Sequence, residues 1–133
     1  MKTITVAAGV LIERNRVLLS QRLSGTHLEG LWEFPGGKVE EGEDPRDAVV
    51  RELKEEVGID CVAREILDVT FYRYAEKSVL LLFFACERLP NSPDPQAIHV
   101  AQVKWATREE LDERVFPPAD LAILRKVSEL LST

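Results

Sequence analysis

The amino-acid sequence predicts an α/β (α+β) fold in which a mixed β-sheet is sandwiched between helices. Strand-like segments occupy the beginning and the middle of the chain, a charged helix at 45–57 separates them, and a second helix at 116–131 closes the chain. The chain has 133 residues, of which 45% are hydrophobic and 30% charged. That length and composition are typical of one globular domain, which we expect to span 1–133.

The predicted strands are short apolar or alternating segments at 3–12, 16–21, about 62–74, 78–88 and 100–106. The stretch "SVLLLFFACE" is apolar without alternation, which is typical of a central strand covered on both faces. We expect a turn at "ERN", between the first two strands. The three prolines of "LPNSPDPQ" predict a loop after the fourth.

The stretch "GLWEFPGG" is predicted to be a strand that runs into a sharp loop. Side chains alternate between the two faces of a strand, so Trp32 and Phe34 should share one face and Glu33 should lie on the other. The loop glycines then lead toward the charged helix.

Local signals define where each helix should begin or end. Asp44 followed by Pro45 is a strong helix start, with the aspartate as N-cap and the proline at the first helical position. Gly58 predicts the C-terminal end of that helix. The final helix is predicted from apolar residues at helical spacing, namely Leu121, Leu124, Val127 and Leu131.

The charge balance limits the classes of partner. A net charge of −6 argues against a broad binding surface for duplex DNA or for an anionic membrane, so we expect neither nucleic acid nor membrane as a partner. No apolar run approaches the 18 residues of a membrane span, and "MKTITVAAGV" is interpreted as a first strand rather than a signal peptide. Cys61 and Cys86 form no CxxC motif, so we expect two free thiols in a cytoplasmic protein.

The helix at 45–57 gathers its acidic side chains on one side. On a helical wheel Arg51, Glu52, Glu55 and Glu56 lie opposite an apolar face formed by Val49, Val50, Leu53 and Val57. Like charges three and four positions apart repel one another by a few tenths of a kcal/mol per pair when exposed. A solvated charged face would explain the run, but clustered carboxylates beside a glycine pair are also the hard oxygen ligands that Mg²⁺ requires.

The same stretch resembles the Nudix box. That motif is a glycine, five residues, a glutamate, seven residues, Arg-Glu, an aliphatic residue, one residue, Glu-Glu, one residue, a glycine and an aliphatic residue. Every spacing is met, by Gly37, Glu43, Arg51-Glu52, Leu53, Glu55-Glu56, Gly58 and Ile59. "QRLSGTHLEG", "WEFPGGK" and "FPPAD" extend the resemblance to the MutT-like branch of the family.

The resemblance implies a Nudix-type α/β/α sandwich with a metal site on the box helix. In that scheme Glu52, Glu55 and Glu56 bind a divalent metal together with the carbonyl of Gly36. We expect Mg²⁺, with Mn²⁺ as an alternative.

The resemblance also implies roles for the catalytic residues. By similarity to the MutT-like branch, Glu52 is expected to act as the base that activates water. Arg51 would orient Glu52, and Glu43 would support the loop–helix junction or an outer metal. The chemistry suits these residue types, because metals must screen the phosphoanhydride oxygens from an incoming nucleophile.

Candidate substrate-binding residues lie outside the box helix. Arg22 and Lys38 are placed to contact phosphate, although each could be only a surface cation. A nucleobase requires an aromatic face and a few polar anchors, and the candidates for these are His27, Phe34, Phe84 and Asp120. Phe84 could belong to the core instead, and Asp120 could only cap the last helix.

One position departs from the MutT-like pattern. Relatives in that branch often carry a glutamate six residues before a tryptophan in the late strand, where it completes the metal shell. The corresponding residue here is His99, counted back from Trp105. Histidine can ligate Mn²⁺ but suits Mg²⁺ poorly, so either the third metal is weaker or a carboxylate such as Asp94 takes its place.

The resemblance implies a metal-dependent nucleoside triphosphate pyrophosphohydrolase that converts NTP and water to NMP and pyrophosphate. The expected substrates are oxidised nucleotides such as 8-oxo-dGTP, and CTP or a modified dCTP is the alternative. A third hypothesis is a Nudix-fold module that senses a nucleotide without turning it over, although the intact box weighs against it. We expect a monomer or a homodimer.

Overall fold

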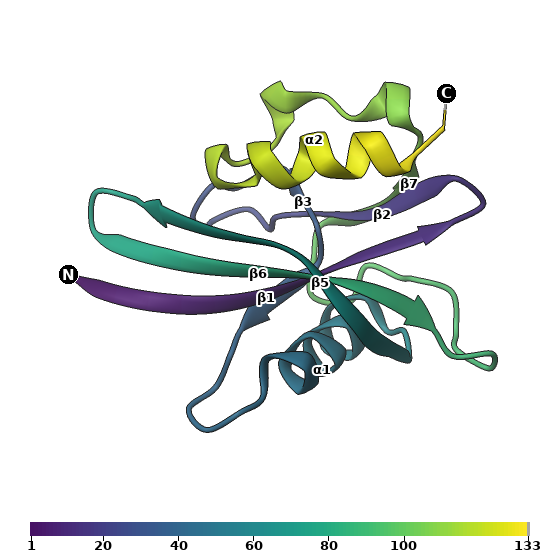
Figure 1. The fold of residues 1–133 in the computed structure, drawn as a ribbon, viewed down its shortest axis with the longest axis horizontal. Helices are drawn as coiled ribbons and strands as arrows, with labels where there is room; N and C mark the ends of the chain where they lie inside the picture. The colour runs from purple at the N-terminus through teal and green to yellow at the C-terminus, as the bar shows by residue number, and fades with distance from the viewer. Residues whose placement is uncertain (133) are drawn as a thin grey trace.

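The computed structural model describes residues 1–132, which form a mixed β-sheet with a helix on each face (Figure 1). The sheet is built from β1 (Lys2–Glu13), β2 (Arg16–Gln21), β3 (Trp32–Glu33), β4 (Gly36–Lys38), β5 (Cys61–Arg73), β6 (Lys77–Arg88) and β7 (Gln102–Ala106). Its main path runs in the order β3-β2-β1-β6-β5, and β4 and β7 pair with β1 and β2. The predicted α/β/α sandwich is therefore confirmed.

The two central strands run parallel and hold the sheet together. β1 pairs with β6 in one unbroken register from Lys2 opposite Lys77 to Leu11 opposite Cys86. All other strand pairs are antiparallel. The interior position expected for "SVLLLFFACE" is confirmed, because β6 lies between β1 and β5.

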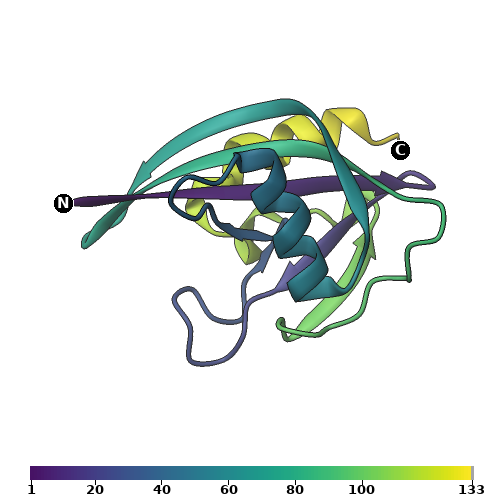
Figure 2. The ribbon, with the colours of Figure 1, turned by 90° about the horizontal axis from the view of Figure 1, so that it is seen from below.

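The helix α1 (Pro45–Val57) begins and ends at the predicted residues. Asp44 is the N-cap, and its side chain accepts a hydrogen bond of 2.8 Å from the backbone N–H of Arg46. Gly58 ends the helix in the left-handed conformation with φ of 74°, and its N–H donates to the carbonyl of Lys54. Figure 2 shows α1 lying across the underside of the sheet.

The stretch Gly36–Lys38 is a strand rather than the expected loop. It forms β4, which pairs antiparallel with β1 so that Gly36 lies opposite Ala8 and Lys38 opposite Val6. A Cβ atom at Gly36 would collide with the backbone carbonyl oxygen of Ala7. Only glycine therefore allows this close approach of β4 to the central strand.

The last helix begins later than predicted. α2 spans Leu121–Leu130, and a 3₁₀ turn at Pro118–Asp120 precedes it, closed by a bond from the N–H of Asp120 to the carbonyl of Pro117. A residue that precedes a proline is pushed away from the helical region of backbone space. Phe116 and Pro117 are accordingly extended, which delays the helix.

The two faces of the sheet carry two hydrophobic clusters. One lies on the α2 side and includes Phe34, Phe83 and Leu124, and the other lies on the α1 side and includes Leu53 and Phe84. The free, buried thiols of Cys61 and Cys86 belong to the α1 side. Among residues 1–132, neither helix has the length and apolar character needed to cross a bilayer.

The substitution Asp44→Ala tests how α1 is held in place. Loss of the side-chain acceptor leaves the N–H of Arg46 without its partner, and we expect the free energy of unfolding to fall by about 1 kcal/mol. Asp44→Asn keeps an acceptor at the same position and should cost much less. Urea denaturation of the three proteins measures the difference, and equal losses for alanine and asparagine would contradict the capping role.

Candidate active site

The acidic face of α1 packs directly against the glycines of β4. The carboxylate of Glu52 occupies the space that a Cβ atom of Gly37 would need, so a side chain at that position would displace Glu52. One turn further along the helix, Oε1 of Glu56 accepts a bond of 3.3 Å from the backbone N–H of Gly36. The two carboxylates therefore lie on the strand that leads into the helix.

Arg51 connects α1 to the preceding loop. Its guanidinium binds both oxygens of Glu43 at 2.9 and 3.0 Å and donates to the carbonyl oxygen of Lys38 at 3.0 Å. Its Nη1 atom also contacts Oε1 of Glu52 at 2.8 Å and Oε2 of Glu55 at 3.3 Å. One cation thus fixes the loop and both helix carboxylates relative to one another.

The carboxylate of Glu43 is stabilised in its charged form. Hydrogen bonds from Arg51, and one from the backbone N–H of Glu40, lower the pKa of Glu43 to about 2. A carboxylate satisfied in this way is a structural anchor for the junction between β4 and α1. This geometry agrees with the supporting role expected for Glu43. The residue does not line the cavity described below.

Glu56 experiences the opposite environment. Burial, followed by repulsion from Glu33 and Glu52, raises the pKa of Glu56 to about 8. Arg22, which binds Glu33 at 3.2 Å, offsets only a small part of this rise in the pKa of Glu56. Burial also raises the pKa of Glu33, and Arg22 offsets part of that effect. The carboxylates of Glu33, Glu52 and Glu56 therefore repel one another, and Arg22 balances only part of their negative charge.

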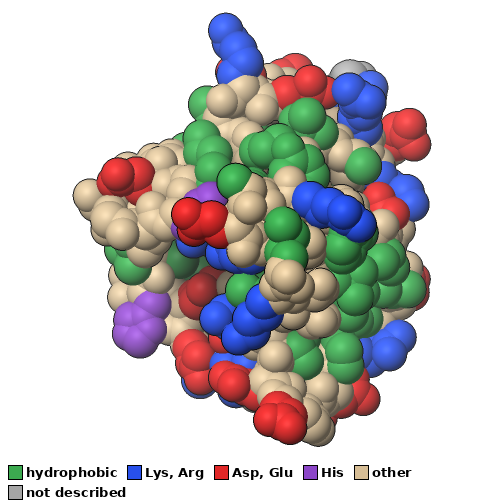
Figure 3. Space-filling model, turned by 90° about the vertical axis from the view of Figure 1, so that its left-hand side faces the viewer, with side chains coloured by type: hydrophobic (Ala, Val, Ile, Leu, Met, Phe, Trp, Pro, Cys, Tyr) green, Lys and Arg blue, Asp and Glu red, His purple; other side chains and the backbone are tan. Residues whose placement is uncertain are grey.

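A cavity of about 280 Å³ opens beside these carboxylates. Five of the six expected substrate-binding residues line it, namely Arg22, His27, Phe34, Lys38 and Asp120, and so do Gly36 and Glu56. On the end of the molecule that Figure 3 shows, acidic side chains gather in the lower part, beside basic ones. The cavity is thus lined by both charged and apolar side chains and is open to solvent.

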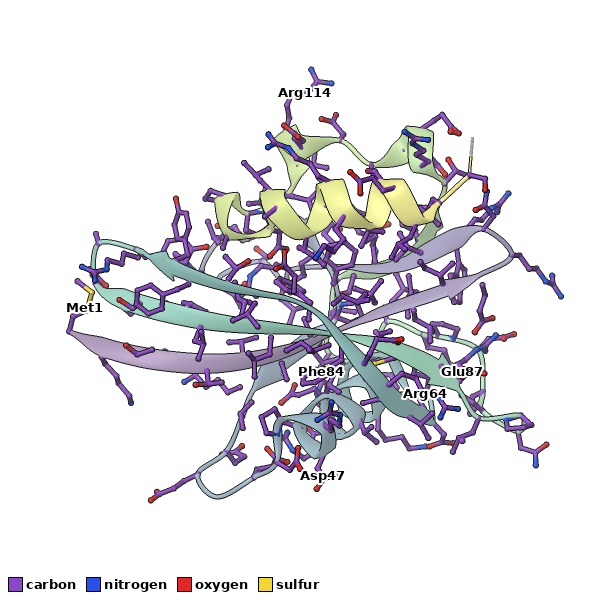
Figure 4. The ribbon with its side chains drawn as sticks, viewed as in Figure 1. Met1, Asp47, Arg64, Phe84, Glu87 and Arg114 are labelled. Atoms are coloured by element: carbon purple, nitrogen blue, oxygen red, sulfur yellow. The ribbon has the colours of Figure 1, made fainter. Side chains whose placement is uncertain are left out.

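Phe84 is the exception. It is buried on the α1 side of β6, where the guanidinium of Arg46 lies 5.2 Å from the centre of its ring, and it does not line the cavity (Figure 4). Its neighbour Phe83 faces the α2 side and lines the cavity instead. The expectation that Phe84 binds substrate is therefore wrong. Phe84 belongs to the hydrophobic core, as the alternative interpretation predicted.

The sequence did not predict several residues that line the cavity, namely Glu33, Tyr74, Lys77 and Phe83. Alternation along "WEF" did not indicate Glu33, because it places Glu33 on the face opposite Phe34, whereas both residues line the cavity. For Tyr74 no signal existed either. It reaches the cavity through the β5–β6 hairpin and contacts the ring of His27 edge-on at 4.9 Å.

Asp120 is a buried acidic residue in the lining of the cavity. Only 6% of the residue is exposed, and its side chain makes no capping hydrogen bond to α2, which disfavours the capping alternative. Burial, with a smaller contribution from Glu33, raises the pKa of Asp120 to about 8. At neutral pH the buried carboxyl is therefore largely protonated.

His99 is exposed, and its described contact is a backbone one, a 3.1 Å bond from its N–H to the carbonyl of Glu56. Across residues 1–132, no three acidic, histidine or cysteine side chains converge tightly enough to form a ready-made metal shell. Arg51 explains this arrangement, because it draws Glu52 and Glu55 toward itself. The donor set nevertheless suits a divalent cation, since it consists of hard oxygens that repel one another.

Comparison with known proteins assigns the fold and site to a family. The family model for the NUDIX domain matches residues 3–129. The chain belongs to the Nudix family. It is 42% identical to an 8-oxo-dGTP diphosphatase of Proteus vulgaris over 68% of this chain and 81% of that protein. It is 34% identical to a CTP pyrophosphohydrolase of Escherichia coli K12 over 93% and 90% of the two chains.

A solved structure agrees. The solution structure of the E. coli ORF135 protein superposes with a TM-score of 0.79 at 33% identity, covering 98% of this chain and 91% of that one. The protein is therefore a Nudix hydrolase, an enzyme of a family that generally requires a divalent metal.

Proposed function

We propose that this Nudix hydrolase is a nucleoside triphosphate pyrophosphohydrolase that converts 8-oxo-dGTP and water to the monophosphate and pyrophosphate in the cytoplasm. The observation that supports this most directly is the cavity itself, whose lining combines the carboxylates of Glu33 and Glu56 with Asp120 and an aromatic wall. Arg22 and Lys38 also line the cavity, and we expect them to contact the phosphates of a bound nucleotide.

The metal site is proposed to consist of Glu52, Glu55 and Glu56 with the carbonyl of Gly36. Mg²⁺ suits this all-oxygen set, and Mn²⁺ is the alternative. When bound, the ion supplies charge neutralisation for the phosphates and acidifies a water molecule. The repulsion that raises the pKa of Glu56 supports the assignment, because a cation there would relieve it.

Glu52 is the proposed general base. Its side chain is only 14% exposed, and Arg51 binds Oε1 at 2.8 Å, which leaves Oε2 to accept the proton of the attacking water. Arg51 acts as the positioning residue, because the same guanidinium is anchored to Glu43 and to the carbonyl of Lys38. The base is therefore held on a rigid helix rather than on a loop.

Glu52→Gln should lower kcat by at least about 10³-fold while the fold stays intact, because the amide neither binds a proton nor ligates a cation as a carboxylate does. Steady-state kinetics together with thermal unfolding measure both properties. Glu41→Gln, in the exposed loop, is the matched control and should retain kcat within about twofold. Near-normal turnover by folded Glu52→Gln would remove the residue from the mechanism.

Divalent metal should raise the melting temperature, and chelation should abolish activity. An ion that relieves repulsion among Glu52, Glu55 and Glu56 stabilises only the folded state. Calorimetry with and without MgCl₂ or MnCl₂ measures the shift, and pyrophosphate release in EDTA measures the activity. In Glu52→Gln the thermal shift should shrink. Pyrophosphate release that survives exhaustive chelation would refute the metal-dependent mechanism.

Asp120 is proposed to contact the base. A protonated carboxyl can donate to O6 of 8-oxoguanine while its carbonyl oxygen accepts from the N7–H, so the raised pKa supports this substrate at neutral pH. An ionised carboxylate only accepts. It would repel O6, and it would instead take the exocyclic amine of cytosine directly.

CTP or a modified dCTP is therefore the second candidate, and the place of Asp120 in the cavity lining favours it, because an ionised carboxylate there would accept from the cytosine amine. The 34% identity to a CTP pyrophosphohydrolase supports the same alternative. A sensing module that binds without turnover is the third possibility. Pyrophosphate release from a panel of nucleotides separates all three.

The substitution Asp120→Asn should change specificity in a pH-dependent way. The folded-state pKa is raised, so the carboxyl is protonated well below pH 8 and becomes ionised as the pH rises through about 8. Asparagine does not titrate. At pH 9 the variant should therefore shift the kcat/KM ratio toward 8-oxo-dGTP over CTP by roughly tenfold or more, equivalent to ~1–2 kcal/mol for one polar contact. At pH 6 the shift should be much smaller. An unchanged ratio across pH 6 to 9 would mean that Asp120 does not contact the base.

A further inference from the structure

A second cavity, of about 610 Å³, lies at the other end of the molecule from the active site. Its lining includes Glu13, Arg14, Arg16, Arg88, Asp94 and Trp105. In Figure 1 the β1–β2 turn that borders it is at the right-hand end, whereas the N-terminal half of β1, which borders the active site, is at the left. No residue is common to the linings of the two cavities.

The floor of this cavity continues the α1 face of the sheet beyond the helix. Glu13 lies directly opposite Arg16 in the β1–β2 pair, and Trp105 lies opposite Leu18 in the β2–β7 pair. Directly opposed residues of antiparallel strands share a face, and every second residue of a strand does too. Leu18 belongs to the cluster beneath α1, so Trp105 and Arg16 extend the same face outward.

Arg88 forms ion pairs with both acidic residues that line this cavity. Its guanidinium binds both oxygens of Glu13 at 2.7 Å and Oδ1 of Asp94 at 2.8 Å. It also donates to the carbonyl of Pro93 and lies 5.9 Å from the ring centre of Trp105. The two lining carboxylates are thus already paired with Arg88, whose side chain is only 20% exposed.

Arg14 and Arg16, in contrast, are exposed, and within residues 1–132 neither guanidinium has a salt bridge or a side-chain hydrogen bond. Arg14 occupies the first position of a two-residue turn at φ of 49°, where glycine, asparagine or aspartate is normally favoured. The side chain of Asn15, the second turn residue, bonds the backbone N–H and carbonyl of Ser132 at 2.8 and 2.9 Å. These hydrogen bonds therefore hold Arg14 beside the cavity, in a backbone conformation that is unfavourable for arginine.

We propose that this cavity is an accessory binding site for a nucleotide. The phosphate would bind the guanidiniums of Arg14 and Arg16, which have no ion pair within residues 1–132, and the aromatic ring would lie against the exposed part of Trp105. The volume falls in the range of small-molecule sites, and Arg88 neutralises the carboxylates that would otherwise repel an anion. The proposal goes beyond the hydrolytic site, because it uses none of that site's residues.

The test uses the full chain carrying Trp32→Phe, which leaves Trp105 as the one remaining tryptophan of the two in the sequence. Its fluorescence is titrated with adenosine monophosphate in EDTA. We expect saturable quenching. Adding Arg14→Asn and Arg16→Gln should weaken Kd at least tenfold. Asparagine is chosen because it suits the left-handed turn, so the hairpin should stay folded.

Matched controls separate this site from general charge and from the active site. Arg114→Gln with Arg125→Gln removes the same charge from a distant surface, where Figure 4 shows Arg114 at the edge of the molecule, and should leave Kd within twofold. Asp120→Asn should also leave it unchanged. The Arg14/Arg16 variant should keep its kcat/KM for nucleoside triphosphates within twofold.

Three results would overturn the proposal. They are the absence of saturable quenching, equal weakening by the control pair or by Asp120→Asn, and displacement of the nucleotide by inorganic phosphate at the nucleotide's own affinity. The last result would mean that Trp105 contributes nothing and that the site holds a simple anion. Hydrolytic activity is measured separately, so failure of the accessory site and failure of the proposed reaction remain distinguishable.

Discussion

The close packing of β4 between β1 and the acidic face of α1 is the constraint on which the rest of the site depends. At Gly36 a Cβ atom would collide with the backbone carbonyl oxygen of Ala7, and at Gly37 it would displace the carboxylate of Glu52. Two consecutive glycines therefore bring a helix carboxylate onto the backbone of a central sheet. The position of Glu52 follows from the sheet register, since each glycine is paired with a defined residue of β1.

Environment gives chemically identical side chains different roles. Glu43 shares a bidentate ion pair with Arg51, which lowers its pKa to about 2, and Glu56 is buried beside other carboxylates, which raises its pKa to about 8. The first is a permanent anion that fixes the loop. The second is destabilised as an anion until positive charge arrives. Divergent environments for neighbouring carboxylates are characteristic of functional sites, because ordinary surfaces do not retain such repulsion.

The sequence was most informative where local chemistry decides the structure. The limits of α1 were predicted correctly because Asp44, Pro45 and Gly58 act on their own backbone, and the box spacing identified the family. Long-range packing decides the stretch Gly36–Lys38, which is a strand only because β1 is available to pair with it. The late start of α2 is a local effect instead, because each of two consecutive prolines keeps the residue before it extended. Phe84 was misplaced because an unbroken apolar strand carries no alternation from which to assign its faces.

The way in which β1 pairs with two different strands explains why the acidic helix can reach the cavity that Asp120 lines. The N-terminal half of β1 pairs with β4 at Val6–Ala8, whereas its C-terminal end pairs with β2 at Ile12 and Glu13. Between these two partners the sheet on that side is divided. Glu56, from α1, and Asp120, from the α2 side, consequently line the same cavity although their elements cover opposite faces. A continuous sheet would have kept them apart, so the short glycine strand both positions the carboxylates and allows them to reach the cavity from the opposite face.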